Sequence, residues 1–306
     1  MSATLSPSCE ESYGVARVCA VWEIPRSTLY DRRDRAKTRS QGLVCASKRG
    51  PRTTLSDADL VARIRGILEQ VERKSGWRGE GYRKVHARLR FGGVRVCRRR
   101  VLRLMRENAL LAPTRTGRVR GPQVHDGKII TEMPDQMWGT DGTTTLTTAE
   151  NSAWVFAAID HCTGECVGIH ASKTGTRFEA LEPILQGVGE IFGSLASGVA
   201  AGLALRHDHG SQYMSDHFQA EIRWLGIESS PSFVRAPEGN GVAERFMRTV
   251  KEQVLWVRTF QTIEELRLAL QDFRRQYNET WILGRHAYRT PSEVRRHLTP
   301  HEARAA

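Results

Sequence analysis

At 306 residues, the chain is long enough to bury a sizeable hydrophobic core and to form two or three domains. Apolar residues make up 40% of the sequence, and no apolar run is long enough to cross a bilayer, which excludes membrane-spanning classes. The first residues lack the basic and apolar regions of a secretory signal. We therefore expect a cytoplasmic globular protein whose six cysteines are free thiols.

The positive charge of the chain is concentrated in its first part. Residues 1–120 contain 28 Lys/Arg and 11 Asp/Glu, a net charge of +17, whereas the whole chain has +12, so residues 121–306 carry −5. A basic segment of this density predicts a polyanion partner, because its arginines can neutralise phosphates and release counterions. The alternative is a basic surface that is merely solvated.

Residues 13–36 are predicted to form two short helices joined by a turn at residues 23–24. Apolar residues recur there at helical spacing, and Pro25 suits the start of the second helix because its missing N–H needs no partner at that position. We interpret residues 1–36 as a helix-turn-helix domain, with an ordinary helical hairpin as the alternative. The second helix carries the candidate groove contacts, namely Ser27, Thr28, Tyr30 and Arg32.

A polar, basic linker at residues 37–55 separates this domain from a second one at residues 56–112. The second domain opens with a helix whose N-cap is Ser56, because Asp59 follows three residues later and an apolar stripe runs behind it.

Two more helices, GYRKVHARLRF and VRVCRRRVLRLMREN, complete this second domain, which has a helix-turn-helix outline. Val101, Leu104 and Met105 form the inner face of the last helix. A three-helix unit that is merely basic outside is the alternative. The candidate DNA contacts project from the outer face, namely Arg98, Arg99, Arg103 and Arg106.

Residues 113–135 are predicted to be a basic linker, and residues 136–260 a domain of another kind. Its pattern favours three strands, a helix, a strand, a helix and a strand, which is a mixed sheet with helices packed on it. The first three strands are expected at residues 138–145, 152–160 and 165–171, the last two forming a hairpin, and the fourth and fifth at residues 203–208 and 226–229. Residues 261–306 are expected to be a helical extension.

Three carboxylates stand out in this domain. Asp141 interrupts a strand, where an acid is disfavoured, and Asp208 lies where a strand ends. Glu244 follows Asp208 with 35 residues between them, on a helix that is predicted to start from a turn at residues 239–241 and to run to about residue 258. Arg248 and Lys251 share the face of Glu244 on that helix and are suited to contact a phosphate.

Three carboxylates from two strands and a helix would suit hard divalent cations, which prefer oxygen ligands. Two such ions can activate a water or a 3′-hydroxyl and stabilise the leaving oxygen in phosphoryl displacement. The rival acids Asp160, Asp216 and Glu238 are interpreted as structural or solvated, and Asp216 fits the first turn of a helix.

The stretches around the three acids, WGTDGTTT, RHDHGSQY and PEGNGVAERFMRTVKEQ, resemble the motifs of DDE transposases of the two-reading-frame insertion-sequence type. The 35-residue gap between the last two acids is typical of that group, whose core is similar to retroviral integrase. GYRKVHARLR and VRVCRRRVLRLMRENALL resemble the helix-turn-helix segment before the core, and YNETW with YRTPSEV resembles the usual ending. The resemblance covers roughly residues 55–295.

This resemblance implies an RNase H-like α/β core, preceded by all-α DNA-binding modules, with two Mg²⁺ or Mn²⁺ ions. By the same resemblance, Asp141, Asp208 and Glu244 are the catalytic metal ligands, and Lys251 matches the basic residue seven positions after the family's Glu. The implied partner is double-stranded DNA, both terminal inverted repeats and target, which a homo-oligomer cleaves and joins at the bacterial nucleoid.

Two other functions remain open at this point: a nuclease that cuts without joining, and a DNA-binding repressor with an inert core. The additional helix-turn-helix at residues 13–36 favours a chain that is complete without a frameshifted partner.

Overall fold

The computed structural model describes residues 3–8, 10–40, 55–113, 131–232 and 240–299. The chain divides into two compact units, Met1–Thr54 and Leu55–Ala306, which we take separately. Most of the expected linker 37–55, most of the expected linker 113–135, and the rival acid Glu238 lie outside the described residues.

The first unit contains the two helices that its sequence predicts, α1 (Gly14–Val21) and α2 (Arg26–Ser40). The turn between them includes Glu23, which has a left-handed backbone with φ of 51°. Cys19 is buried between them. The predicted groove contacts Ser27, Thr28, Tyr30 and Arg32 are all exposed on α2, so their side chains are accessible to a partner; their role stays a prediction.

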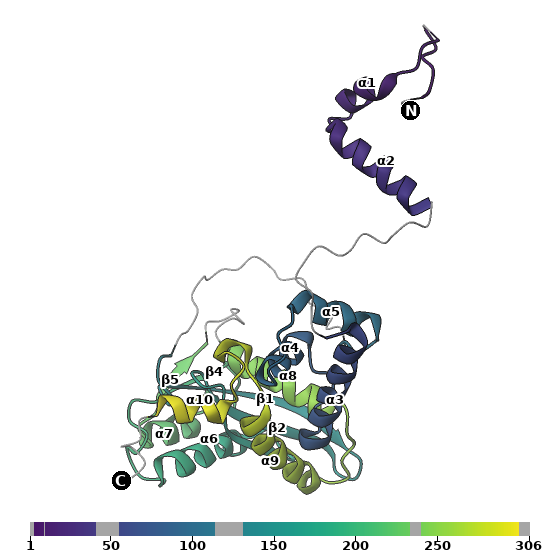
Figure 1. Cartoon of the computed structure of the whole chain (residues 1–306). Helices are drawn as coiled ribbons and strands as arrows, with labels where there is room; N and C mark the ends of the chain where they lie inside the picture. Colours follow the sequence, from purple (N-terminus) through teal and green to yellow (C-terminus); the bar gives the residue numbers. More distant parts are fainter. Residues whose placement is uncertain (1–2, 9, 41–54, 114–130, 233–239, 300–306) are drawn as a thin grey trace. The chain divides into compact units, whose positions relative to one another are not determined.

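The second unit begins with three helices, α3 (Asp57–Ser75), α4 (Tyr82–Phe91) and α5 (Arg98–Glu107), as the sequence predicts (Figure 1). We call residues 55–113 the helical module. Ser56 caps α3, accepting a hydrogen bond from the Asp59 backbone N–H, as expected. The apolar faces of all three helices meet in one core. Its buried members include Leu60, Ile64, Val85, Leu89, Val101, Leu104 and Met105.

A five-stranded mixed sheet follows, in the order β3-β2-β1-β4-β5 (Figure 1). The first three strands form antiparallel pairs, and β1, β4 and β5 are parallel, which confirms the predicted mixed sheet. The expected hairpin is the pair β2 and β3. Their bounds are β1 Met137–Thr147, β2 Asn151–Asp160, β3 Cys166–Ser172, β4 Ala204–His207 and β5 Glu228–Pro231.

Helices cover both faces of the sheet, because side chains alternate along the strands and each face is largely apolar. On one face lie α6 (Arg177–Phe192) and α7 (Asp216–Trp224), packed around Trp138 and Phe156. On the other lie α8 (Gly241–Val250), η2 (Lys251–Leu255) and α9 (Ile263–Thr280), packed on Val155 and Ala157.

The edge of the sheet at β3 is covered by polar side chains of α9. Arg267 donates to the Ala171 carbonyl, and Gln271 to the Ile169 carbonyl. Arg274 and Asn278 donate to the Cys166 carbonyl one and two turns further on. Because unpaired strand edges promote aggregation, this ladder of side chains stabilises an otherwise open edge.

The last described elements are a short 3-10 turn, η3 (Gly284–His286), and α10 (Pro291–Leu298), which is held on the sheet domain by ion pairs. Arg295 of α10 donates to both carboxylate oxygens of Asp135, at 2.5 and 2.9 Å, and also contacts Glu165. The expected helical extension is therefore anchored beside the start of β1.

One expected helix is divided. The sequence predicts a single helix that starts from a turn at residues 239–241 and runs to about residue 258, whereas α8 gives way after Val250 to the π-helical turn η2. This widening changes which side chains share a face beyond Lys251. Among the described residues, no helix is long and apolar enough to span a membrane.

Candidate active site

Asp141 and Asp208 come together through the pairing of two parallel strands. Gly139 of β1 lies opposite Arg206 of β4, and Asp208 directly follows β4. The same register, continued by two residues, sets Asp141 beside Asp208 on one face of the sheet, because side chains of equal phase point the same way. The register thus places two of the predicted site residues side by side, and their role as metal ligands stays a prediction.

Asp141 lies in an environment that opposes its ionisation. Burial raises the pKa of its carboxyl to about 6, and the nearby negative charge of Asp208 adds to the rise. Two effects oppose it: the Gly142 N–H donates to Asp141 Oδ1 at 2.8 Å, and the positive charge of Lys251 lowers the pKa. The mid-strand acid is thus held at a cost in free energy, which a cation would remove.

Asp208 is exposed and sits in a tight turn. Its Oδ1 accepts the Gly210 N–H at 2.8 Å, and a Cβ at Gly210 would lie 2.9 Å from the same oxygen. A larger residue at this position would therefore require the side chains of Asp208 and Gln212 to shift. Buried His207 donates its Nδ1–H to the Asp208 carbonyl at 2.7 Å and accepts from Ser229 Oγ at 2.9 Å. Burial lowers the pKa of His207, which favours this neutral form.

Glu244 lies in the first turn of α8, the helix that Asn240 ties to β1. Partial loss of hydration, and then the charge of Asp141, raise the pKa of its carboxyl. Asp141 therefore interacts with both of the other acids, which places all three in one electrostatic neighbourhood. The three carboxylates come from β1, from the end of β4 and from α8, as the sequence predicts.

The cations on the Glu244 helix have different surroundings. Lys251 lies near enough to Asp141 to lower its pKa. Arg248, one turn before it, pairs with Glu252 through a hydrogen bond of 2.9 Å. A phosphate would have to compete with Glu252 for Arg248, so of the two predicted contacts Lys251 is placed closer to the acids.

The donor set fits a hard divalent cation in chemistry, since all three groups are carboxylates and the pKa values of Asp141 and Glu244 are raised. Within the described residues, however, no three potential ligands are close enough together to hold a metal ion as they stand. Residues 233–239, just before α8, lie outside the described residues. A shift of the exposed Asp208 and Glu244 toward Asp141 would be needed to complete a site.

A buried polar cluster beside Asp141 was not predicted. Asn240, the N-cap of α8, donates through Nδ2 to the Thr140 carbonyl at 2.8 Å, which ties the helix of Glu244 to the strand of Asp141. A Cβ at Gly139 would lie 2.6 Å from His161 Nε2 and 2.9 Å from Asn240 Oδ1, so glycine admits both side chains. The only sequence signal was the small residue two positions before the acid.

We expect Asn240→Ala to lower the free energy of unfolding by about 1–3 kcal/mol, because the Thr140 carbonyl is left buried without its donor. Urea unfolding of the full chain measures this. Asn108→Ala is the control, since its amide bonds the Leu104 carbonyl within its own helix, and it should cost less than about 1 kcal/mol. Equal losses in the two variants would contradict the assignment.

The described rival acids have structural surroundings, as expected. Asp160 is fully buried and accepts the backbone N–H groups of Asp135 and Thr163 and the Thr163 hydroxyl. Burial raises its pKa. Asp216 is exposed in the first turn of α7. Neither is drawn into the cluster around Asp141.

The predicted DNA contacts of the helical module differ in availability. Arg98, Arg99 and Arg106 project from α5. Arg103 is engaged: it pairs with Asp57 at 2.6 Å and with Glu107 at 2.8 Å. Arg103 therefore also stabilises the packing of α5 on the start of α3.

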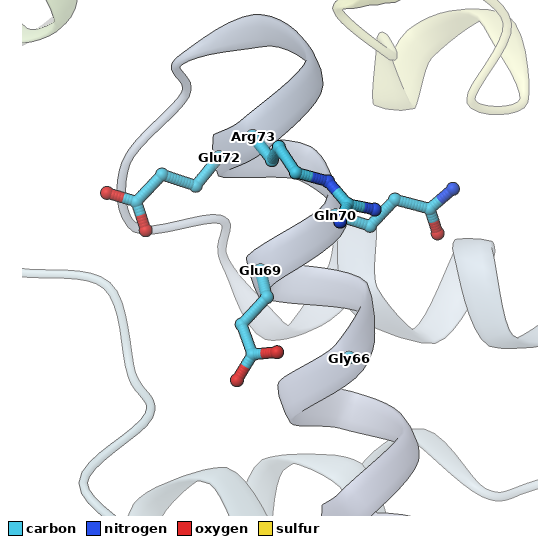
Figure 2. Close-up of a pocket in the computed structure, with 5 residues that line it drawn as sticks. All are labelled: Gly66, Glu69, Gln70, Glu72 and Arg73. Atoms are coloured by element: carbon cyan, nitrogen blue, oxygen red, sulfur yellow. The ribbon is translucent and has the colours of Figure 1, made fainter.

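Two hollows lie on the described surface of the second unit, and neither is lined by the three acids. One is an open depression along α3, where Glu69 and Glu72 point away from Gln70 and Arg73 (Figure 2). The other is a cleft of about 1140 Å³ between the helical module and the C-terminal segment.

A mixed sheet in this order, with a carboxylate on its first strand, one after its fourth and one on the following helix, defines an RNase H-like core of the integrase type. A family model described as "Integrase core domain" matches residues 225–291, which include Glu244, and an "HTH-like domain" model matches residues 55–118. Both matches, and the insertion-element proteins described next, agree with the resemblance of the chain to DDE transposases of the two-reading-frame insertion-sequence type.

Its relatives include the transposase InsD of insertion element IS2A/D/F/H/I/K from Escherichia coli, which is 28% identical over 247 residues covering 78% of this chain and 79% of InsD. A 48.2 kDa protein of insertion element IS2A from the same species is 28% identical over 248 residues. That match covers 79% of this chain but only 56% of the relative.

Among solved structures, the simian T-cell lymphotropic virus intasome in complex with PP2A regulatory subunit B56 gamma is similar, with a TM-score of 0.47 and 16% identity. The match covers 80% of this chain and 76% of that one.

Proposed function

We propose that the protein binds the terminal inverted repeats of an insertion element, cleaves a DNA strand at each end and joins the freed 3′ ends to target DNA. It would act as a homo-oligomer on DNA at the bacterial nucleoid. The observation that carries the proposal is geometric: the register of β1 on β4 sets Asp141 beside Asp208, and Asn240 ties α8, the helix of Glu244, to β1. The similarity to the InsD transposase and to the integrase core model supports the same reaction class.

In this proposal the three carboxylates hold divalent Mg²⁺ or Mn²⁺, expected as two ions. The bound cations would polarise the scissile phosphate and favour deprotonation of the attacking hydroxyl group. Asp141, rigid within the sheet, would supply the fixed ligand, and the exposed Asp208 and Glu244 would close onto the cations. Lys251 would leave Asp141 and contact a phosphate oxygen of the DNA end.

The candidate contacts in the front half would supply most of the affinity for DNA and would take no part in the cleavage reaction. The end of the duplex would be contacted by α5, through Arg98, Arg99 and Arg106. A second stretch of the duplex would be contacted by α2, through Ser27, Thr28 and Arg32. Arg103 would join them by giving up one of its two carboxylate partners.

A strand-transfer assay tests the proposal. The full chain is incubated with Mg²⁺, a supercoiled target and a labelled duplex that ends in the element's pre-cleaved terminal repeat. We expect labelled ends joined to the target, and no joined product when EDTA is present. Cutting without joining would favour a nuclease, and DNA binding without either reaction would favour a repressor.

A further inference from the structure

One continuous helix contributes to the hydrophobic clusters of both the helical module and the sheet domain. The first half of α3 contributes Leu60 and Ile64 to the core of the module, whereas Val71 near its other end belongs to the cluster built on α8 and α9. Ile67, between them, packs against both clusters. A helix of this length spans about 28 Å and does not bend easily, so it connects the two domains as a rigid rod.

Trp77, just after the end of α3, is the centre of this contact. Its side chain is 4% exposed, and its Nε1–H donates to Thr280 Oγ1 at 2.8 Å. The indole meets Phe273 edge-on, with the ring centroids 5.4 Å apart, and Trp281 in the same manner at 5.2 Å. Such pairs are stabilising beyond the area that they bury, so the module is held by a specific geometry.

A second contact fixes the same loop from another element. Gln253 of η2 accepts the Arg78 backbone N–H at 3.0 Å through Oε1 and donates through Nε2 to the Arg78 carbonyl at 3.3 Å. From α4, Lys84 Nζ lies 3.1 Å from the centroid of the Trp281 ring. The loop after α3 is therefore held by α9, by the C-terminal segment and by the turn that extends the Glu244 helix.

The aromatic contacts continue from Trp77 to the helix of Glu244. Phe273 and Tyr277 of α9 stack with centroids 5.8 Å apart, and both contact Phe246, at 6.0 and 4.9 Å. Phe246 lies two residues after Glu244 on α8. The cluster that receives Trp77 is thus the one on which the Glu244 helix packs.

Beside this contact the two domains separate. The cleft of about 1140 Å³ is lined by α3 and α4 on one side and by residues 279–297 on the other, and its walls include Val71, Ser75 and Thr280. Because the neighbouring space is open, the orientation of the module depends strongly on the contacts of Trp77 and Arg78.

We propose that Trp77 and Gln253 are positioning residues, which set the distance and angle between DNA held by the helical module and the three acids, and so select the phosphate that is cut. This inference rests on the proposed cleavage of element ends. The fixed docking of the helical module on the sheet domain would specify the cut site. Neither Trp77 nor Gln253 would contact the reacting atoms.

Cleavage of a labelled terminal-repeat duplex by the full chain tests this, with the cut position resolved to the nucleotide. For Trp77→Ala we expect cuts spread over neighbouring phosphates and a rate at saturating DNA about 100-fold lower, since a misplacement of about 1 Å has an effect of that size. DNA affinity should stay within about threefold. Trp77→Phe should keep the cut position and recover most of the rate, because it retains the aromatic contacts.

Gln253→Ala should spread the cuts with a smaller fall in rate, about tenfold, and it tests the proposal even if Trp77→Ala fails to fold. Gln271→Ala is its matched control, because Gln271 also bonds a backbone carbonyl, that of Ile169, but inside the sheet domain. Trp256→Ala is the control for Trp77, since Trp256 is 68% exposed. Both controls should cut at the wild-type position.

Hydrogen exchange separates failure of this inference from failure of the proposed function. We expect faster amide exchange at residues 71–78 in Trp77→Ala and Gln253→Ala, with or without DNA. A wild-type chain that never cleaves DNA would overturn the proposed function, yet faster exchange would still show the docking. Unchanged exchange, or an unchanged cut position in folded Trp77→Ala and in Gln253→Ala, would overturn the positioning role.

Discussion

Replacing any one of Asp141, Asp208 and Glu244 by its amide should abolish DNA cleavage and leave DNA binding intact. We expect the rate with Mg²⁺ to fall by at least about 1,000-fold in Asp141→Asn, Asp208→Asn or Glu244→Gln, because a metal-held transition state is worth several kcal/mol and each 1.4 kcal/mol is tenfold in rate. Single-turnover cleavage of a terminal-repeat duplex measures the rate, and filter binding or anisotropy measures the affinity.

The matched control for these variants is Asp216→Asn, an exposed acid that lies in the first turn of α7, eight residues after Asp208. It should cleave at the wild-type rate. Double variants within the trio should be no slower than the singles, because the three acids act as one unit. Normal cleavage by one of the single variants would remove that residue from the proposed site and leave the other two to be reassigned.

The second large effect is on stability and has the opposite sign. Asp141→Asn should raise the free energy of unfolding at pH 7 and without metal by about 1–3 kcal/mol, because burial and Asp208 raise the pKa of Asp141 from 3.8 to about 6. The ionised carboxylate destabilises the fold above pH 6. As the pH falls from 6 to about 4 the folded state takes up the proton first, so wild type gains stability and the difference between the two proteins disappears.

Urea unfolding from pH 4 to pH 8 measures this difference, and added Mg²⁺ provides a second test. A cation held by Asp141 should stabilise the wild type, with a rise in the melting temperature of about 2–4 °C for each kcal/mol of binding, and Asp141→Asn should respond much less. A difference in the free energy of unfolding between wild type and Asp141→Asn that is the same at every pH would contradict the electrostatic account. An equal response of both proteins to Mg²⁺ would place the cation elsewhere.

The local elements follow from the sequence because their signals are local. Ser56 with Asp59 marks the start of α3, and the spacing of apolar residues marks the three helices of the module. The single acid in WGTDGTTT, and the acid at the end of a later strand, can likewise be recognised from the sequence. Even the face of Asp141 follows from alternation along the strand, since Trp138 is buried on the other side.

Other features depend on contacts that only the folded chain forms. The bond from Asn240 to the Thr140 carbonyl, and the fit of His161 over Gly139, join residues that the sequence gives no reason to pair. The spacing of apolar residues predicts one continuous helix here, so it gives no sign that the Glu244 helix is divided into α8 and the π-helical η2.

The sequence by itself singled out the three acids as candidates for the chemistry, because the type of side chain and its place on a strand or helix are local properties. Only the tertiary structure decided how the acids meet, since the register of β1 on β4 sets Asp141 beside Asp208. It also decided how the helical module is held, because Trp77 packs on Phe273 and Trp281, nearly 200 and just over 200 residues away along the chain. Packing between distant segments depends on the shape of both surfaces at once, and no local pattern specifies it.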